Sequence, residues 1–203
     1  MSHPLFIVFE GIDGCGKSTQ LRLLCEKLTA LGRTPVPTAE PTDTATGKML
    51  RRALSGEESR TAAEMAALFT LDRIHHNKGK DGIEEYLQKG FDVISDRYYY
   101  SSLAYQGSLT DYDWVKHMNC DCPEIRKPDL CIFLDMSPKA ALARIGKRGE
   151  AKEIYEKEET LTLFRATFLK VFSSLEDNVA IIDAEGSPDE VAARVFAAVA
   201  PLL

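Results

Sequence analysis

Near its start the chain reads Leu5-Phe6-Ile7-Val8-Phe9-Glu10-Gly11-Ile12-Asp13-Gly14-Cys15-Gly16-Lys17-Ser18. The first five of these residues form a continuous apolar run, which is typical of a parallel β-strand that is covered on both faces. Leucines at helical spacing follow the quoted stretch, and Gly32 ends that pattern in the manner of a glycine C-cap. The sequence therefore predicts a strand, a glycine-rich loop and a helix in immediate succession.

The loop between this strand and this helix fits the pattern G-x-x-x-x-G-K-[ST]. Its glycines allow a tight turn that brings backbone N–H groups against phosphate oxygens, and the N-terminus of the helix points its positive end at the same anion. Lys17 adds a full charge at the β- and γ-phosphates, and the Ser18 hydroxyl is placed to ligate Mg²⁺. We predict a nucleoside triphosphate site made by Gly11, Ile12, Asp13, Gly14, Cys15, Gly16, Lys17 and Ser18.

Strand and helix patterns alternate along the rest of the chain. Strands are predicted at 34–38, 91–95, 130–134 and 179–182, the last three as buried strands, and helices at 61–76, 81–88, 137–145, 156–174 and 188–199. The alternation predicts an α/β fold with a mostly parallel sheet of about five strands and helices on both faces. Without a repeat or an obvious linker, residues 1–203 are expected to form one domain. Ligands of such sheets bind beyond the carboxyl ends of the strands.

The composition argues against several classes of protein. The 203 residues include 25 Lys or Arg and 31 Asp or Glu, and this formal charge of −6 makes the chain a poor candidate for binding nucleic acid. No apolar run approaches the ~20 residues of a membrane-spanning helix, so no membrane partner is expected. Five cysteines without framework spacing indicate reduced thiols and a cytoplasmic location. The pair Cys120 and Cys122 offers too few ligands for a structural zinc and is interpreted as loop thiols.

Three classes of protein share the phosphate loop: switch GTPases, ATP-driven machines and kinases of small molecules. The guanine-reading N-K-x-D motif of GTPases has a superficial counterpart in Asn77-Lys78-Gly79-Lys80-Asp81, but here the acidic residue comes one position late and the segment lies at a helix end. A machine would usually need a larger chain or a partner domain. The sequence therefore favours a small-molecule kinase.

A second motif, Asp96-Arg97-Tyr98, directly follows the predicted strand 91–95. If that strand neighbours the first one, Arg97 lies beside the phosphate loop, where an arginine can bridge oxygens of a phosphate donor and an acceptor. Here the chain resembles the thymidylate kinases over nearly its whole length. The segment from Phe9 to Gln20 is similar to that family's F-E-G-x-D-G-x-G-K-[ST]-T-Q, and the second motif with Ser101-Ser102-Leu103-Ala104-Tyr105-Gln106-Gly107 is similar to D-R-Y-x-x-S-S-x-A-Y-Q-G.

The resemblance implies a P-loop kinase-type three-layer fold and transfer of the γ-phosphoryl group of ATP to dTMP with Mg²⁺ as cofactor. It also implies a homodimer, although a monomer explains the composition equally well. Catalytic roles are implied for Lys17, Arg97 and Asp13, and for a lid arginine, Arg144 or Arg148, in a segment around 143–155. Thr19 joins the ATP site, and the metal is assigned to Ser18 and Asp13. The dTMP site implied is Phe69 on the base, Tyr105 under the sugar, and Arg51, Arg73, Arg97, Ser101, Ser102 and Gln106 as polar contacts.

The chain departs from the family pattern at a few positions. Ala39 stands where the family commonly has an arginine, and Thr42-Asp43 stands in place of Gly-Gly. Gly14 occupies a loop position that carries an arginine in one subgroup, so the catalytic arginine is expected from the lid. Two alternatives stay open: another P-loop nucleoside or nucleotide kinase, and a non-catalytic regulator that binds ATP.

Overall fold

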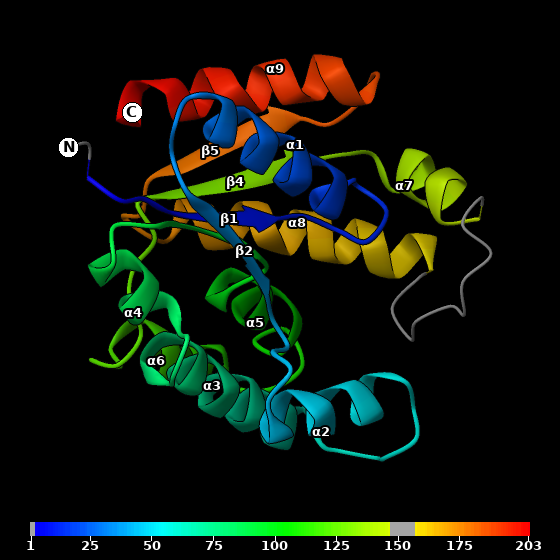
Figure 1. Ribbon diagram of the computed structural model, residues 1–203. Helices are drawn as coiled ribbons and strands as arrows, with labels where there is room; N and C mark the ends of the chain where they lie inside the picture. The colour runs from blue at the N-terminus through cyan, green and yellow to red at the C-terminus, as the bar shows by residue number, and fades with distance from the viewer. Residues whose placement is uncertain (1–2, 147–156) are drawn as a thin grey trace.

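The computed structural model describes residues 3–146 and 157–203. Within these residues a single parallel sheet has the strand order β2-β3-β1-β4-β5 (Figure 1). The sheet is built from β1 (Phe6–Glu10), β2 (Pro35–Ala39), β3 (Asp92–Asp96), β4 (Leu130–Asp135) and β5 (Val179–Asp183). This confirms the predicted α/β fold, and it places β3 directly beside β1, with Phe9 opposite Asp96.

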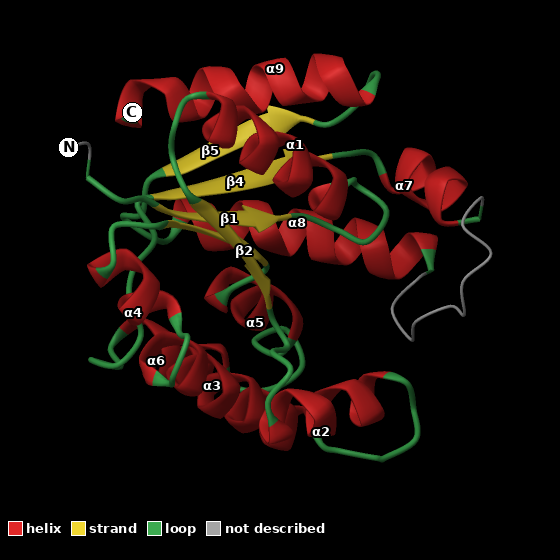
Figure 2. Cartoon of the chain, viewed as in Figure 1, coloured by secondary structure: helices red, strands yellow, loops and turns green. Residues whose placement is uncertain are grey.

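Helices cover both faces of the sheet (Figure 2). Helices α1 (Lys17–Ala30) and α9 (Pro188–Val199) lie on one face, and α5 (Tyr99–Tyr105) and α8 (Glu158–Ser173) lie on the other. The remaining described helices are α2 (Ala45–Leu54), α3 (Ala62–Lys78), α4 (Ile83–Gln88), α6 (Tyr112–Cys120), α7 (Pro138–Ile145) and the 3₁₀ turn Ala200–Leu202. The structure therefore has three layers, and α2, α3, α4 and α6 lie together beyond α5, on the side of the molecule where β2 forms the edge of the sheet.

Three helices were missed from the sequence, each for a physical reason. All residues of α5 are buried, so the segment has no polar face and no amphipathic period. The other two, α2 and α6, are short, although each begins with a side-chain cap: Thr44 accepts a hydrogen bond from the Gly47 N–H, and Asp111 accepts one from the Trp114 N–H. These caps are the local signal that could have located them.

The expectation that strand 179–182 is buried was wrong. Strand β5 pairs with β4 alone and forms one edge of the sheet. Its Ile181 side chain is 54% exposed as a result. An apolar run predicts a strand, but it does not distinguish a central strand from an edge strand.

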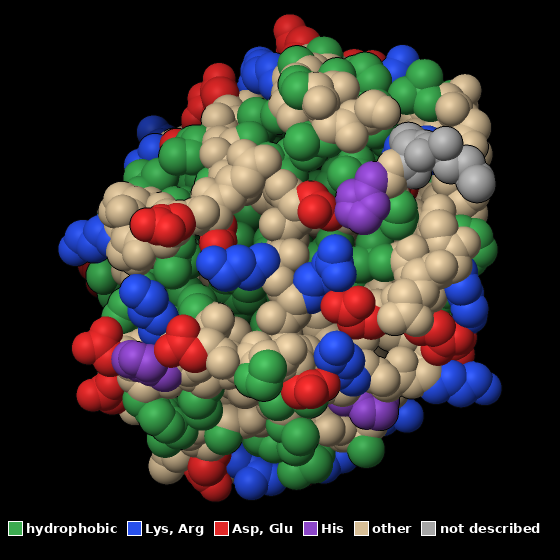
Figure 3. Space-filling view, turned by 90° about the vertical axis from the view of Figure 1, so that its left-hand side faces the viewer, with side chains coloured by type: hydrophobic (Ala, Val, Ile, Leu, Met, Phe, Trp, Pro, Cys, Tyr) green, Lys and Arg blue, Asp and Glu red, His purple; other side chains and the backbone are tan. Residues whose placement is uncertain are grey.

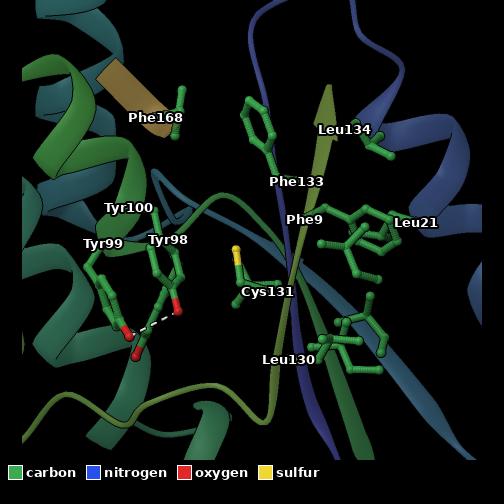
Figure 4. Packing of buried hydrophobic residues seen from close by; sticks show 14 of the residues in the cluster. Phe9, Leu21, Tyr98, Tyr99, Tyr100, Leu130, Cys131, Phe133, Leu134 and Phe168 are labelled. Atoms are coloured by element: carbon green, nitrogen blue, oxygen red, sulfur yellow. Dashed lines mark hydrogen bonds between the residues drawn. The ribbon is translucent and has the colours of Figure 1, made fainter. Parts of the chain in front are cut away.

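The aromatic residues that follow β3 belong to the core. Figure 4 shows Tyr98, Tyr99 and Tyr100 on the same side of β4 as Phe133 and Phe168. All three tyrosines are at most 1% exposed. The hydroxyls of Tyr99 and Tyr100 both donate to the buried Asp177 carboxylate. This packing fixes α5, and with it the turn that carries Arg97, against the sheet.

The face at the amino ends of the strands carries charged side chains of both signs (Figure 3). Lys and Arg residues are interspersed there with Asp and Glu residues among apolar and neutral polar ones. In the described chain, moreover, no helix combines the length and the apolar character needed to cross a membrane. Most of the side chains predicted to bind nucleotides lie at the opposite edge of the sheet, at the carboxyl ends of the strands.

Candidate functional site

A cavity of about 390 Å³ opens at the carboxyl ends of β1, β2 and β3. The phosphate loop forms one wall, and the segments after β2 and β3, together with α2, α3 and α5, form the others. Its lining includes Asp13, Gly14, Gly16, Lys17, Ser18, Glu40, Arg51, Phe69, Arg73, Asp96, Arg97, Tyr98, Ser101, Tyr105 and Gln106. The topology thus brings together twelve of the residues predicted for the two nucleotide sites, from five separate segments of the chain.

The phosphate loop has the conformation that its glycines permit. Gly14 has φ +82, and a Cβ atom there would lie 2.5 Å from the Ala141 carbonyl oxygen. The Lys17 ammonium folds over the loop and donates to the carbonyls of Gly11 at 3.0 Å and Ile12 at 3.3 Å. The N-terminus of α1, whose first residue is Lys17, faces the same space. Backbone N–H groups and one ammonium therefore converge where an anion can bind.

Arg97 and Lys17 meet at one carboxylate oxygen. The Arg97 guanidinium forms an ion pair with Oδ1 of Asp13, and the Lys17 Nζ lies 3.9 Å from that same atom. Arg97 also donates to the Ser101 hydroxyl at 3.1 Å and lies over the Tyr105 ring. Its φ of 71 is unusual for a residue with a side chain, and the turn after β3 holds it there. The two cations predicted to act on phosphate oxygens are thus adjacent.

Asp96 is a site residue to which the sequence analysis gave no role. The Ser18 hydroxyl donates to its Oδ2 atom at 3.0 Å. Its Oδ1 atom is buried and accepts no hydrogen bond within the described part of the chain. A hydroxyl and a carboxylate beside a phosphate loop are the oxygen ligands that Mg²⁺ takes, so the pair fits a divalent cation. The signal in the sequence that could have located Asp96 was its position directly after the predicted strand 91–95.

Glu10 is a second residue that the sequence did not reveal. It is fully buried at the end of β1, and its carboxylate accepts hydrogen bonds from the N–H groups of Tyr98 at 2.9 Å and Ser101 at 3.0 Å, and from the Ser101 hydroxyl at 2.7 Å. Burial raises the pKa of Glu10 to about 7, against the opposing effect of the nearby Arg97 and Lys17 charges. The carboxylate therefore holds the turn that presents Arg97.

The wall formed by α3 contains Phe69 and Arg73, four residues apart on one helix face. Arg73 is 1% exposed, and both its Nε and its NH2 donate to Oε2 of Glu40, at 2.9 and 2.6 Å. Phe69 is partly buried against the small apolar cluster of α2 and α3 and reaches the cavity beside Leu54. This wall combines an aromatic face with a cation that is held in one orientation.

The loop after β2, at the position where the family has Gly-Gly, is held by side chains of α3 and α2. The buried Asp72 carboxylate accepts hydrogen bonds from the N–H of Thr42 at 2.8 Å and from the hydroxyls of Thr42 and Thr44. Arg51 donates to the carbonyls of Pro41 and Thr42, both at 2.7 Å. The predicted Arg51 therefore reaches the cavity and also closes this loop onto α2.

At the C-terminal end of α5, Tyr105 and the C-cap residue Gln106 reach the cavity, and both are buried. The Tyr105 ring packs on Phe164 of α8 with a centroid separation of 4.2 Å. Ser102 lies behind the cavity wall, where its hydroxyl accepts a hydrogen bond from Arg73 at 3.2 Å. Ser102 is thus placed to support Arg73, whereas Tyr105 and Gln106 are placed to touch a ligand.

Other predicted residues lie around the cavity. Ile12 and Cys15 are buried and offer only their backbone groups, and Gly11 and Thr19 also lie outside the lining. The Arg144 guanidinium donates to the carbonyls of Cys15, Ala184 and Gly186, each at 3.3 Å, so it ties the outer side of the loop to the turn after β5. Arg148 and most of the lid segment 143–155 lie outside the described residues.

The chain is similar to known proteins over nearly its whole length. Residues 9–195 match the family model "Thymidylate kinase". A thymidylate kinase of Leptospira borgpetersenii is 37% identical over 94% of this chain and 91% of its own length, and a probable thymidylate kinase of Pyrobaculum aerophilum is 40% identical over 94% and 93%. The structure of a thymidylate kinase from Candida albicans superposes with a TM-score of 0.82 at 24% identity, covering 99% of this chain and 93% of that one.

Proposed function

This chain belongs to the thymidylate kinase family, and from that premise we propose that it transfers the γ-phosphoryl group of ATP to dTMP and so produces dTDP. The observation that carries the proposal is the meeting of Lys17 and Arg97 at one oxygen of Asp13. Lys17 belongs to the donor loop and Arg97 to the turn after β3. Their junction is the place where the phosphates of two nucleotides can touch.

The reaction is mainly an electrostatic problem. Two anions must meet in a protein whose formal charge is −6, and cations gathered at the contact offset their repulsion. Asp13 neutralises Arg97, and a phosphate of dTMP that reaches Arg97 would replace Asp13 as its anionic partner. No general base is required, because the second pKa of a phosphate monoester is ~6 and the attacking oxygen is already ionised at neutral pH.

Mg²⁺ fits the pair Ser18 and Asp96. The buried Oδ1 of Asp96 has no partner in the described part of the chain. The other oxygen of this carboxylate, Oδ2, accepts a hydrogen bond from the Ser18 hydroxyl. A bound Mg²⁺ would neutralise charge on the β- and γ-phosphates. Asp13, the other residue proposed for the metal from the sequence, faces Arg97 and Lys17 and is better suited to orient these cations.

The acceptor nucleotide lies against α3 and α5 in this proposal. Phe69 stacks on the base, Arg73 supplies an N–H donor beside it, and Tyr105 lies under the sugar. Arg51, Ser101 and Gln106 contribute polar contacts. Arg148 serves as the lid arginine, because Arg144 already binds three carbonyls around the donor loop.

We assign the active protein to the cytoplasm as a homodimer. The dimer is supported by the neighbouring helices α3 and α6, on which Leu71 is 54% exposed and Trp114 is 41% exposed. Sedimentation equilibrium of the wild type and of Leu71→Asp tests this assembly. A wild type that sediments as a monomer would contradict it.

A panel of acceptors tests the reaction. The purified protein, ATP and Mg²⁺ are combined with dTMP, dUMP, dCMP, UMP or thymidine, and ADP formation is followed in a coupled assay. The proposal expects the highest kcat/KM with dTMP and no turnover in Lys17→Ala, whose circular dichroism should be unchanged. A preference for thymidine would indicate a nucleoside kinase, and ATP binding without transfer to any acceptor would indicate a regulator.

A further inference from the structure

A chain of buried polar side chains leads from β2 to the wall of the acceptor cavity. The His76 ring lies between the Thr38 hydroxyl, 2.7 Å from its Nε2, and Oε1 of Glu40, 3.0 Å from its Nδ1. The other oxygen of Glu40 accepts two N–H groups of Arg73. His76 is 7% exposed, Glu40 5% and Arg73 1%. His76 thus has both nitrogens engaged and touches no part of the cavity itself.

The donors and acceptors in this chain can be counted. A guanidinium has five N–H groups, and a carboxylate accepts on both of its oxygens. Contacts within the described residues use four N–H groups of Arg73: two to Glu40, one to Ser102 and one to Asn119. One N–H remains on a side chain that lines the cavity. Glu40 also lines the cavity, and its Oε2 is engaged by Arg73. Among the described residues, His76 alone donates to Oε1 and so keeps that oxygen from being a free acceptor.

We propose that His76 is a positioning residue that determines which base the acceptor site takes. By donating from Nδ1 to Glu40, it holds that carboxylate on Arg73, so that this wall of the cavity presents a donor and no free acceptor. Such a wall fits a pyrimidine with a carbonyl at C4, as in thymine, and disfavours one with an amino group at C4, as in cytosine. This inference rests on the proposed function, because it takes a nucleoside monophosphate as the acceptor.

Two amide substitutions separate the contacts of His76. The side-chain nitrogen of His76→Asn lies at the position of Nδ1, so it can still donate to Glu40 but loses Thr38. The side-chain nitrogen of His76→Gln lies at the position of Nε2, so it keeps Thr38 and leaves Oε1 of Glu40 without its donor. Both variants bury one amide, and the smaller side chain is that of His76→Asn, so a loss of packing is greater in the variant that is expected to keep the wild-type ratio. The exposed His75→Asn is the matched control.

The experiment measures kcat and KM for dTMP and dCMP with each variant. The proposal expects the ratio of kcat/KM for dTMP over dCMP to fall about tenfold in His76→Gln, mainly through KM, and to stay close to wild type in His76→Asn and His75→Asn. Equal ratios in the Asn and Gln variants would overturn the role of His76, even if both are less active or less stable. A wild type that phosphorylates neither monophosphate would instead overturn the proposed function, so the two failures are distinguishable.

Discussion

Replacing Glu10 with glutamine should change the pH dependence of folding in a defined direction. Glu10 is fully buried, and burial raises the pKa of its carboxyl from an ordinary 4.5 to about 7. Below the lower value both the folded and the unfolded chain hold the proton. Between the two values the folded chain keeps a proton that the unfolded chain releases, so the free energy of unfolding falls as the pH rises. Above pH ~7 the loss is complete.

The size of this effect follows from the interval between the two pKa values. One pKa unit corresponds to about 1.4 kcal/mol, so the change from 4.5 to about 7 destabilises the folded wild type by about 3 kcal/mol across this range. Glutamine has a similar shape and does not ionise. Its carbonyl can accept the N–H groups of Tyr98 and Ser101, so the turn at Arg97 should keep its conformation.

Denaturant unfolding at about pH 5 and about pH 8 measures the difference. The free energy of unfolding of Glu10→Gln, relative to wild type, should rise by about 2–3 kcal/mol between the two conditions. The same change at Glu159, an exposed residue of α8, serves as the control and should give no such rise. If Glu10→Gln and wild type respond equally to pH, the carboxyl does not change its protonation in this range and the reasoning is refuted.

The nucleotide sites give three further predictions. Asp96→Asn should raise the Mg²⁺ concentration for half-maximal activity about tenfold, and an unchanged Mg²⁺ titration would contradict the metal assignment. Gly14→Ala puts a Cβ 2.5 Å from the Ala141 carbonyl oxygen and should abolish ATP binding in calorimetry, whereas Gly32→Ala, with nothing within 4 Å, should cost only about 1–2 kcal/mol of stability. If Gly14→Ala and Gly32→Ala bind ATP equally well, the steric argument is refuted. Tyr105→Ala should lower the ratio of kcat/KM for dTMP over UMP; a constant ratio would remove its role at the sugar.

The donor loop was predictable because its information is local. Its eight residues carry the turn, the ammonium and the hydroxyl, and the strand and helix on either side are visible as apolar patterns. The position of Arg97 was predictable in part, since it follows a strand and the carboxyl ends of parallel strands share one edge. Its adjacency to Lys17 depends on β3 lying beside β1, and the sequence alone did not establish that strand order.

Several important residues were invisible in the sequence because their roles come from distant partners. Glu10 acquires its function from Tyr98 and Ser101, which lie 88 and 91 residues further along the chain. Glu40 meets Arg73 and His76 only because α3 packs beside the end of β2. No spacing rule predicts such contacts, since the separations along the chain reflect loop lengths and not the geometry of one helix or strand.

By itself the sequence determined an α/β chain with a donor phosphate loop and an arginine at the end of a later strand, since short-range patterns dictate where strands, turns and helices form. Only the tertiary structure decided which charged groups face one another and which are removed from water. Strand order and helix packing place Asp96 beside Ser18, Asp13 between two cations, and Glu10 in the core. Burial and proximity then set the pKa of Glu10 and the orientation of Arg73, because electrostatic interactions depend on distance in space and on exclusion of solvent, neither of which is written in the order of residues.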